Sequence, residues 1–206
     1  MQKPDFEIER AEHASGSRRI AGVDEVGRGP LAGPVTAAAV VLDPNKIPDG
    51  IRDSKTLTPL RREKVCAAIL DSAEVVVAHA SVEEIDRINI LQATFLAMTR
   101  ALEGLTPAPD LALVDGQRLP KAMPCPGRAI IRGDAICLSI AAASIVAKVA
   151  RDKLMWDLAQ QYPGYGWETN AGYGSKSHMA ALQNLGATPH HRRSFKPVHN
   201  ILYQEK

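Results

Sequence analysis

The stretch from Ser139 to Leu158 most constrains the fold, because its apolar residues recur at the spacing of an α-helix. The recurring positions are Ile140, Ala143, Ala147, Ala150, Leu154 and Leu158. Ile145, Val146 and Val149 widen the apolar surface around the first turns. A helix that is apolar around much of its circumference is buried, so we expect this helix to lie at the centre of the fold.

The other elements alternate between strand and helix patterns. Apolar runs predict strands over residues 20–26, 35–42, 74–80, 111–114 and 129–131. Helices are predicted over residues 59–71, 90–105 and 175–185. Thr58 before Pro59 is a helix start, and Ser81 opens a capping box with Glu84. Strands first, then strands alternating with helices, indicate a mixed α/β layer architecture.

Chain length and composition indicate one domain. A chain of 206 residues, 45% hydrophobic and 23% charged, is long enough for one substantial core. We expect a polar N-terminal lead-in over residues 1–17, of the kind that is often mobile, and a single domain over residues 18–206. Its C-terminal region, from about residue 175, is predicted to be helical.

Cysteine spacing and charge indicate the cellular compartment and the kind of partner that the chain has. Cys66, Cys125 and Cys137 are far apart and form neither a zinc spacing nor a disulfide framework, which favours the reducing cytoplasm. No signal peptide or membrane-spanning run is recognisable. The net charge of +2 does not by itself indicate a nucleic-acid binder. Basic residues do gather at 190–193 and at Lys196, which predicts a local basic patch.

The main chemical signal is a pair of acids, Asp24 and Glu25, followed by Gly27-Arg28-Gly29. Glycines let a backbone approach a ligand closely and expose its N–H groups to phosphate oxygens. The acids suit a metal, so the stretch suggests phosphodiester chemistry. It also fits an ordinary strand end with two solvated acids and a glycine turn. Neighbouring strand residues point to opposite faces, so both acids reach one metal only if the strand ends or distorts there.

A nucleotide-binding P-loop is a further alternative for this stretch, because Gly22 and Gly27 have the spacing of its first and last glycines. A P-loop then requires Lys followed by Ser or Thr. Arg28 and Gly29 stand there instead, which argues against a nucleotide hydrolase.

Two more acids lie at predicted strand exits. Asp115 stands in Val114-Asp115-Gly116, and Asp134 follows Gly133. Singly, each has an ordinary explanation, since Asp-Gly is a common turn and Asp134 could cap the next helix. Oxygen ligands brought together from separate strands would suit Mg²⁺ or Mn²⁺.

Over nearly its whole length the chain resembles bacterial ribonuclease HII, the type 2 ribonuclease H family. The ordered blocks that carry the resemblance are Asp24-Glu25-Val26-Gly27-Arg28-Gly29, Asp53-Ser54-Lys55, Val114-Asp115-Gly116, Gly133-Asp134 leading into the segment 139–152, Gly172-Tyr173-Gly174 with His178, and His191-Arg192-Arg193-Ser194-Phe195. One small departure is Ser175, where many relatives have threonine. The resemblance implies a ribonuclease H-like fold, a mixed β-sheet flanked by helices with a helical C-terminal part.

The resemblance also implies the activity. Asp24, Glu25, Asp115 and Asp134 would be the catalytic residues and the ligands of two divalent ions, Mn²⁺ or Mg²⁺. Two such ions can activate a water and steady the leaving 3′ oxygen. The substrates would be RNA–DNA hybrids and duplex DNA with a single ribonucleotide, cut on its 5′ side to leave 5′-phosphate and 3′-hydroxyl ends. Such an enzyme supports removal of misincorporated ribonucleotides and RNA primers.

Substrate-binding roles are carried over in the same way. Gly27, Arg28 and Gly29 would sense the 2′-hydroxyl, and Tyr173 would stack near the sugar at an RNA-to-DNA junction. Lys55 and Arg192 would contact phosphates. Without the resemblance, Tyr173 reads as a half-buried loop tyrosine, Lys55 as a solvated lysine, and the run at 192–193 as a charged face.

Other residues near these blocks carry no assigned chemistry. Lys148 and Asp152, one helical turn apart, are predicted to form a structural pair. His190, His191 and His199 have no metal-ligand spacing, and the individual roles of His178 and Arg193 stay open. We expect a monomer without a C-terminal tail for docking to a replication clamp.

Two alternatives remain from the sequence alone. A non-catalytic hybrid-binding module would need the basic residues but not the acids, and four acids placed to repel a phosphate backbone argue against it. A structure-selective nuclease such as a junction resolvase would keep the fold and ignore the 2′-hydroxyl. The Gly-Arg-Gly loop and Tyr173 argue against that second alternative.

Overall fold

The computed structural model describes residues 3–203 of the chain. Five strands form one mixed sheet in the order β3-β2-β1-β4-β5. The strands are β1 (Ile20–Val26), β2 (Val35–Leu42), β3 (Ala73–Ala80), β4 (Leu111–Asp115) and β5 (Gly127–Ile130). Strands β1, β2 and β3 are antiparallel neighbours, whereas β4 runs parallel to both β1 and β5. The parallel pairs bring the carboxyl ends of β1 and β4 to the same edge.

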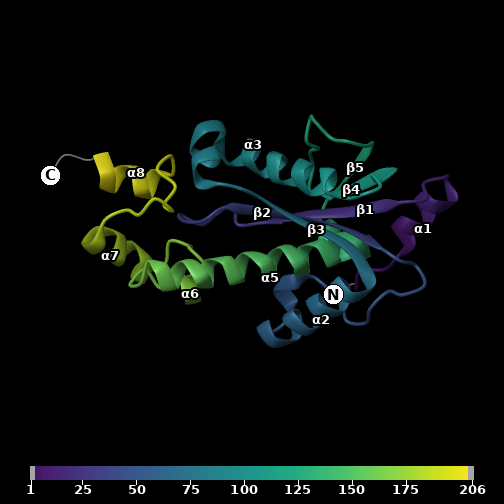
Figure 1. Ribbon diagram of the computed structural model, residues 1–206, viewed down its shortest axis with the longest axis horizontal. Helices are drawn as coiled ribbons and strands as arrows, with labels where there is room; N and C mark the ends of the chain where they lie inside the picture. The colour runs from purple at the N-terminus through teal and green to yellow at the C-terminus, as the bar shows by residue number, and fades with distance from the viewer. Residues whose placement is uncertain (1–2, 204–206) are drawn as a thin grey trace.

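Helices cover both faces of this sheet (Figure 1). They are α1 (Glu7–Ala14), α2 (Pro59–Ser72), α3 (Val82–Glu103), α4 (Gly133–Ile136), α5 (Leu138–Gln161), α6 (Trp167–Asn170), α7 (Lys176–Leu185) and α8 (Lys196–Tyr203), with a 3-10 turn η1 (Ser54–Thr56). Helix α3 packs on one face, and α5 with α2 packs on the other. Helices α7 and α8 lie together at one end. No helix within residues 3–203 is long and apolar enough to cross a membrane.

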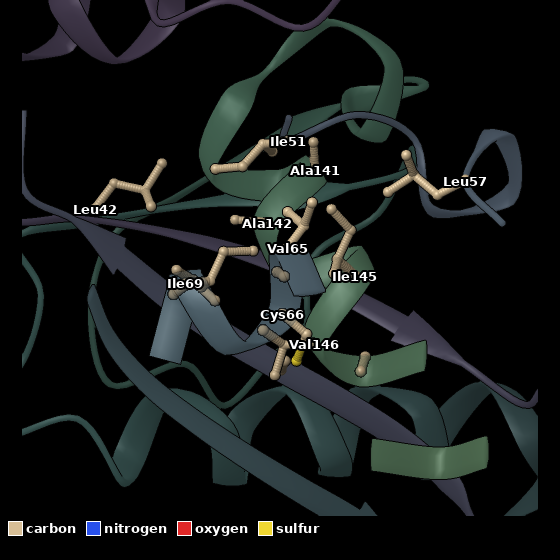
Figure 2. Close-up of a cluster of buried hydrophobic side chains, with 14 of the residues drawn as sticks. Leu42, Ile51, Leu57, Val65, Cys66, Ile69, Ala141, Ala142, Ile145 and Val146 are labelled. Carbon is tan, nitrogen blue, oxygen red and sulfur yellow. The ribbon is translucent and has the colours of Figure 1, made fainter. Parts of the chain in front are cut away.

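The alternation of side chains along β2 explains the two-layered core. Ala38 and Val40 face the cluster formed with α2 and α5, whereas Ala37 and Ala39 face the cluster formed with α3. Figure 2 shows the first cluster, in which side chains of α2 and α5 interdigitate beside the sheet. The predicted central helix is therefore confirmed as α5, whose first three turns are buried almost completely.

Small residues allow α5 to approach the sheet closely. A Cβ atom added at Gly22 of β1 would lie 2.1 Å from the carbonyl carbon of Ser139. Ala141, Ala142 and Ala143 on the facing helix are completely buried. This close contact between β1 and α5 sets the distance between α5 and the acids of β1.

Most predicted elements are confirmed, and their capping residues account for their ends. Strands β1 and β2 have the predicted bounds, and Thr58 caps α2. The Ser81–Glu84 capping box is present at the start of α3. Helix α3 contains a kink at Asn89, whose backbone has a positive φ and whose side chain accepts hydrogen bonds from the backbone N–H groups of residues 91 and 92. The helical rhythm predicted from residue 90 is the second half of this helix.

The N-terminal segment differs from the mobile lead-in expected over residues 1–17. Residues 7–14 form α1, and its preceding residue Phe6 is buried in the core. The carboxylate of Glu9 is buried and accepts a hydrogen bond of 2.7 Å from the backbone N–H of Ser139, at the start of α5. This long-range cap is invisible in the local sequence. Residues 1–2, and the last part of the expected tail-free C-terminus at residues 204–206, lie outside the described residues.

Candidate active site

The four predicted acids gather where β1 and β4 end. Asp24 and Glu25 are the fifth and sixth residues of β1, and Asp115 is the last residue of β4. In the register, Val23 pairs with Val114, so these acids follow directly on neighbouring strands. The backbone N–H of Gly133 donates a 2.7 Å hydrogen bond to Asp115, and this contact holds α4, which carries Asp134, against the same edge.

Asp24 and Glu25 point to opposite sides of the sheet, as the alternation of a regular strand requires. Asp24, only 6% exposed, lies near the Ser144 hydroxyl of α5. Glu25 instead lies beside α3, in a cleft that Asp115 also lines. The strand ends one residue later without distorting at the acids. Besides burial, the charge of Asp115, at the end of the next strand, raises the pKa of both acids.

Burial and mutual repulsion make these carboxylates costly to ionise. Burial, followed by the charges of Glu25 and Asp115, raises the pKa of Asp24 well above its usual value. Burial also raises the pKa of Glu25, which the Arg28 guanidinium opposes from 3.4 Å. For Asp115, burial and then the charge of Asp134 raise the pKa. A cation placed among the four groups would relieve both effects.

The donor chemistry fits a divalent ion. The four acids supply carboxylate oxygens only, the ligands that Mg²⁺ and Mn²⁺ prefer. Within residues 3–203, however, no three acidic, histidine or cysteine side chains stand close enough to hold one ion as they lie. Two of the acids are turned toward a basic side chain instead: Glu25 to Arg28, and Asp134 to Lys55. Binding an ion therefore requires these side chains to exchange those donors for the metal.

Lys55 lies at this acidic edge. Its ammonium is 3.6 Å from the Asp134 carboxylate, and its side chain is 81% exposed. Desolvation lowers the pKa of Lys55, but the negative charges of Asp134 and Asp53 outweigh it, so the pKa is raised. Asp53 caps the η1 turn through the backbone N–H of Lys55 at 2.9 Å. The buried hydroxyls of Ser54 and Ser144 meet at 2.9 Å and connect this turn to the helix behind Asp24.

The Gly-Arg-Gly loop and Tyr173 are brought together. Gly27 has a φ of +91°, which favours glycine, and a Cβ atom there would collide with the Arg151 side chain. A Cβ atom on Gly29 would lie 3.3 Å from the Tyr173 ring. Tyr173 is 48% exposed, so it is accessible to a ligand. The backbone N–H of Leu31 donates a 2.8 Å hydrogen bond to the Gly172 carbonyl, which ties the two loops.

The structure corrects the role that the sequence analysis gave to Arg192. Its side chain is completely buried, and its guanidinium donates to the backbone carbonyls of Gly27, Arg28 and Gly33 at 2.6–2.9 Å. A group enclosed in this way does not reach a substrate phosphate. The prediction of a phosphate contact is therefore wrong. A basic run looks the same in sequence whether its members face solvent or the interior.

A cleft of about 430 Å³ extends from the acids along α3. Its polar side is formed by Glu25, Arg28 and Asp115, and by the loop that follows β4. In that loop, Gln117 and Arg118 line the cleft and were not predicted from the sequence. The one available signal was their position within three residues of Asp115. The apolar floor of the cleft is formed by Leu91, Phe95 and Met98 of α3.

The histidines form a buried network instead of an exposed patch. The Trp167 indole N–H donates to His178 Nε2 at 3.0 Å, which makes that nitrogen an acceptor. His178 Nδ1–H therefore donates to the Tyr173 carbonyl, at 2.8 Å. The Thr188 backbone N–H donates to His191 Nδ1 at 3.0 Å, so His191 Nε2–H donates to His178 at 3.1 Å. Both imidazoles are therefore neutral, and His178 supports the backbone of Tyr173.

The predicted structural pair on α5 is also present. Lys148 donates a 2.7 Å hydrogen bond to Asp152 one helical turn away. Arg62 of α2 approaches the same carboxylate at 3.7 Å. These three residues join α2 to α5.

Comparison with known proteins assigns the family. The family model described as Ribonuclease HII matches residues 21–198. A protein named Ribonuclease HII from Cereibacter sphaeroides is 68% identical over 202 residues, covering 98% of this chain and 95% of the relative. The crystal structure of ribonuclease H2 from Pyrococcus horikoshii OT3 superposes with a TM-score of 0.74 at 29% identity, covering 89% of this chain and 97% of that one.

A more distant structure has the same fold. The crystal structure of Bst-RNase HIII in complex with Mn²⁺ has a TM-score of 0.75 at 20% identity, covering 93% of this chain and 71% of that one. With the ribonuclease H2 structure, it confirms the ribonuclease H-like sheet and its flanking helices. From the family model and the close relative together, the chain belongs to the ribonuclease HII family, divalent-metal-dependent endonucleases that cleave the RNA of RNA–DNA hybrids.

Proposed function

We propose that this chain cuts on the 5′ side of single ribonucleotides embedded in duplex DNA, as well as within longer RNA–DNA hybrids, and leaves 5′-phosphate and 3′-hydroxyl ends. Such cutting would serve the removal of misincorporated ribonucleotides and RNA primers. The observation that carries the proposal is the gathering of Asp24, Glu25 and Asp115 at the ends of β1 and β4, beside the Gly-Arg-Gly loop and the exposed ring of Tyr173.

The acids would hold the cofactor, which we propose to be two Mg²⁺ or Mn²⁺ ions. Asp24 and Asp115 would be central ligands, because Asp24 is the most deeply buried of the four acids and the charge of Asp115 acts on both Asp24 and Glu25. Glu25 and Asp134 would turn from their basic partners to complete the set. Two bound ions supply activation of a water and stabilisation of the leaving 3′ oxygen in an in-line displacement. The raised pKa values of the acids support this assignment, because clustered carboxylates favour a cation.

The basic residues at the edge of the site would bind and orient the substrate. Lys55, released from Asp134 when that acid turns to a cation, would contact a phosphate. Arg28, half-exposed beside Glu25, would contact the backbone near the scissile bond. The Gly-Arg-Gly backbone would read the 2′-hydroxyl, and Tyr173 would stack on the sugar at the RNA-to-DNA junction. The cleft along α3 would receive the strand that continues beyond the cut.

Incubation of the purified protein with defined duplexes tests this function. The substrates are a labelled DNA duplex with one ribonucleotide and the same duplex made of DNA alone, each with Mg²⁺, Mn²⁺ or a chelator. We expect cleavage with metal only, and only 5′ of the ribonucleotide. Tight hybrid binding without cleavage would indicate a non-catalytic binding module. Cleavage of both duplexes would indicate a structure-selective nuclease that ignores the 2′-hydroxyl.

A further inference from the structure

Arg192 reaches the Gly-Arg-Gly loop from a distant part of the chain. Its Nη2 group donates to the Gly27 carbonyl at 2.6 Å, its Nη1 group to the Arg28 carbonyl at 2.9 Å, and its Nε group to the Gly33 carbonyl at 2.9 Å. The guanidinium therefore forms hydrogen bonds to two consecutive peptide units of the loop and to a third one further along the chain. Its backbone N–H also donates to the Leu31 carbonyl, at 2.8 Å.

This arrangement is an expensive way to stabilise a fold. The side chain is completely buried, and among the described residues Arg192 forms no ion pair with a carboxylate. Burial, and then the neighbouring charge of Arg151, lower its pKa to about 9. The compensating interactions are the three carbonyl dipoles, the face of the Phe195 ring, 5.0 Å away, and the more distant charge of Asp86. A buried charge with no acid in direct contact indicates a role beyond packing.

Peptide geometry gives that role. In a planar trans peptide, the C=O of one residue and the N–H of the next point in opposite directions. The peptides of this loop are trans, so carbonyls of Gly27 and Arg28 that point inward to Arg192 direct the amides of Arg28 and Gly29 away from it. Within the described residues, neither amide donates to a backbone carbonyl. Gly29 is also the residue that lies against the Tyr173 ring.

We propose that Arg192 is a positioning residue for substrate recognition, which fixes the amides of Arg28 and Gly29 as a pair of outward hydrogen-bond donors beside Tyr173. Such a pair suits an oxygen of the sugar–phosphate backbone, including a 2′-hydroxyl. The inference rests on the proposed function, because it assigns these amides to the same substrate. Arg192 itself touches no substrate and acts through the loop.

Lysine cannot form the same set of hydrogen bonds to the loop carbonyls. The guanidinium holds several donors in a rigid planar fork, whereas an ammonium is a single point charge on a flexible stem. Arg192→Lys keeps the charge and much of the volume but cannot hold the two loop carbonyls in fixed directions. Arg19→Lys is the matched control. Arg19 also donates to a backbone carbonyl, that of Pro107 at 2.8 Å, and pairs with Glu74, but it lies next to the opposite end of β1.

The test compares steady-state cleavage of the duplex with one ribonucleotide by the wild type and both variants. For Arg192→Lys we expect KM to rise about tenfold, because a tenfold loss of affinity corresponds to the loss of one to two hydrogen bonds to the substrate. The value of kcat should change far less. Arg19→Lys should leave KM unchanged. A loss of stability alone would lower the active fraction and hence the apparent kcat, not KM. An unchanged KM in Arg192→Lys overturns the proposal, whereas failure of the wild type to cut this duplex overturns the proposed function instead.

A second measurement uses the wild type alone, so that it holds even where Arg192→Lys does not fold. Amide hydrogen exchange at Arg28 and Gly29 is followed with and without the ribonucleotide duplex, in chelator to prevent cleavage. We expect exchange at both amides to slow on binding, while the all-DNA duplex slows it less. Exchange that is the same in the free protein and in the complex would overturn the proposal.

Discussion

Replacing Asp24 by asparagine should make the metal-free protein more stable while it abolishes cleavage. The carboxylate is nearly fully buried, and burial together with Glu25 and Asp115 raises its pKa. Asparagine has the same shape and can still accept the 2.7 Å hydrogen bond that the Glu25 backbone N–H donates to Asp24 Oδ1. The substitution therefore removes a confined charge without removing its main contact. Its free energy of unfolding should rise, unlike that of most substitutions in a protein interior.

The size of the gain follows from the cost of the buried charge. Relieving an uncompensated buried charge is worth about 1–3 kcal/mol, and for a chain of this length each kcal/mol shifts Tm by about 3 °C. We therefore expect Asp24→Asn to raise Tm by about 3–9 °C at neutral pH in chelator. Cleavage should fall by at least about a thousandfold, equivalent to about 4 kcal/mol of lost transition-state stabilisation. Hybrid binding should be largely retained.

The pH dependence of the free energy of unfolding distinguishes the loss of a buried charge from a general effect of the substitution on packing. The folded state raises the pKa of Asp24, so the unfolded chain loses its proton first as the pH rises from about 4. Wild-type stability relative to the variant therefore falls with increasing pH, until the folded carboxyl also ionises. Below the unfolded pKa the carboxyl is protonated in both states, and this electrostatic difference disappears.

Thermal unfolding of both proteins, at several pH values and with or without Mn²⁺, measures these effects. Saturating Mn²⁺ should stabilise the wild type, by about 2.7 kcal/mol at a hundred times Kd, and the variant much less. A variant that is less stable than the wild type in chelator at neutral pH would refute the electrostatic reasoning. Undiminished turnover by Asp24→Asn would remove this residue from the mechanism.

Three further substitutions test separate parts of the structure. Tyr173→Ala should reduce cleavage at a single embedded ribonucleotide more than cleavage of a long hybrid, because stacking at the junction is lost. If the variant cuts the single-ribonucleotide duplex as fast as the wild type does, Tyr173 has no role at the junction. Gly22→Ala should destabilise the protein by more than about 3 kcal/mol in urea unfolding, because its Cβ would overlap the Ser139 backbone; near-wild-type stability would contradict the tight β1–α5 contact. Burial and then the charge of His178 lower the pKa of His191 to about 4, so the neutral network stabilises the fold above about pH 6.5, and stability is lost as the pH falls toward 4. The loss should reach about 2 kcal/mol at pH 5, and His191→Gln, measured by urea unfolding at pH 7 and 5, should show a flatter dependence.

Local patterns were sufficient for the layers of the fold. Strands β1 and β2 and helix α5 have strong apolar periods, and α2 and α3 begin at recognisable caps. The sequence did not predict α1, and it placed α8 only within a helical C-terminal region, without bounds; both helices are only eight residues long. Short helices of this kind are stabilised by tertiary contacts more than by propensity. For α1, these are the burial of Phe6 and the contact of Glu9 with α5, across more than a hundred residues.

The same distinction separates the parts of the candidate site. The acids stand at strand ends, where an apolar run followed by acid and glycine is visible within a few residues, so Asp24, Glu25 and Asp115 could be proposed from sequence. Whether an arginine binds a phosphate or a carbonyl depends on what surrounds it in three dimensions. Arg192 meets the Gly27 carbonyl across 165 positions of chain, so no local pattern separates the two roles. Acids at strand ends leave a local signature in the sequence, whereas a residue that holds a distant loop in place, such as Arg192, is identified only after the chain is folded.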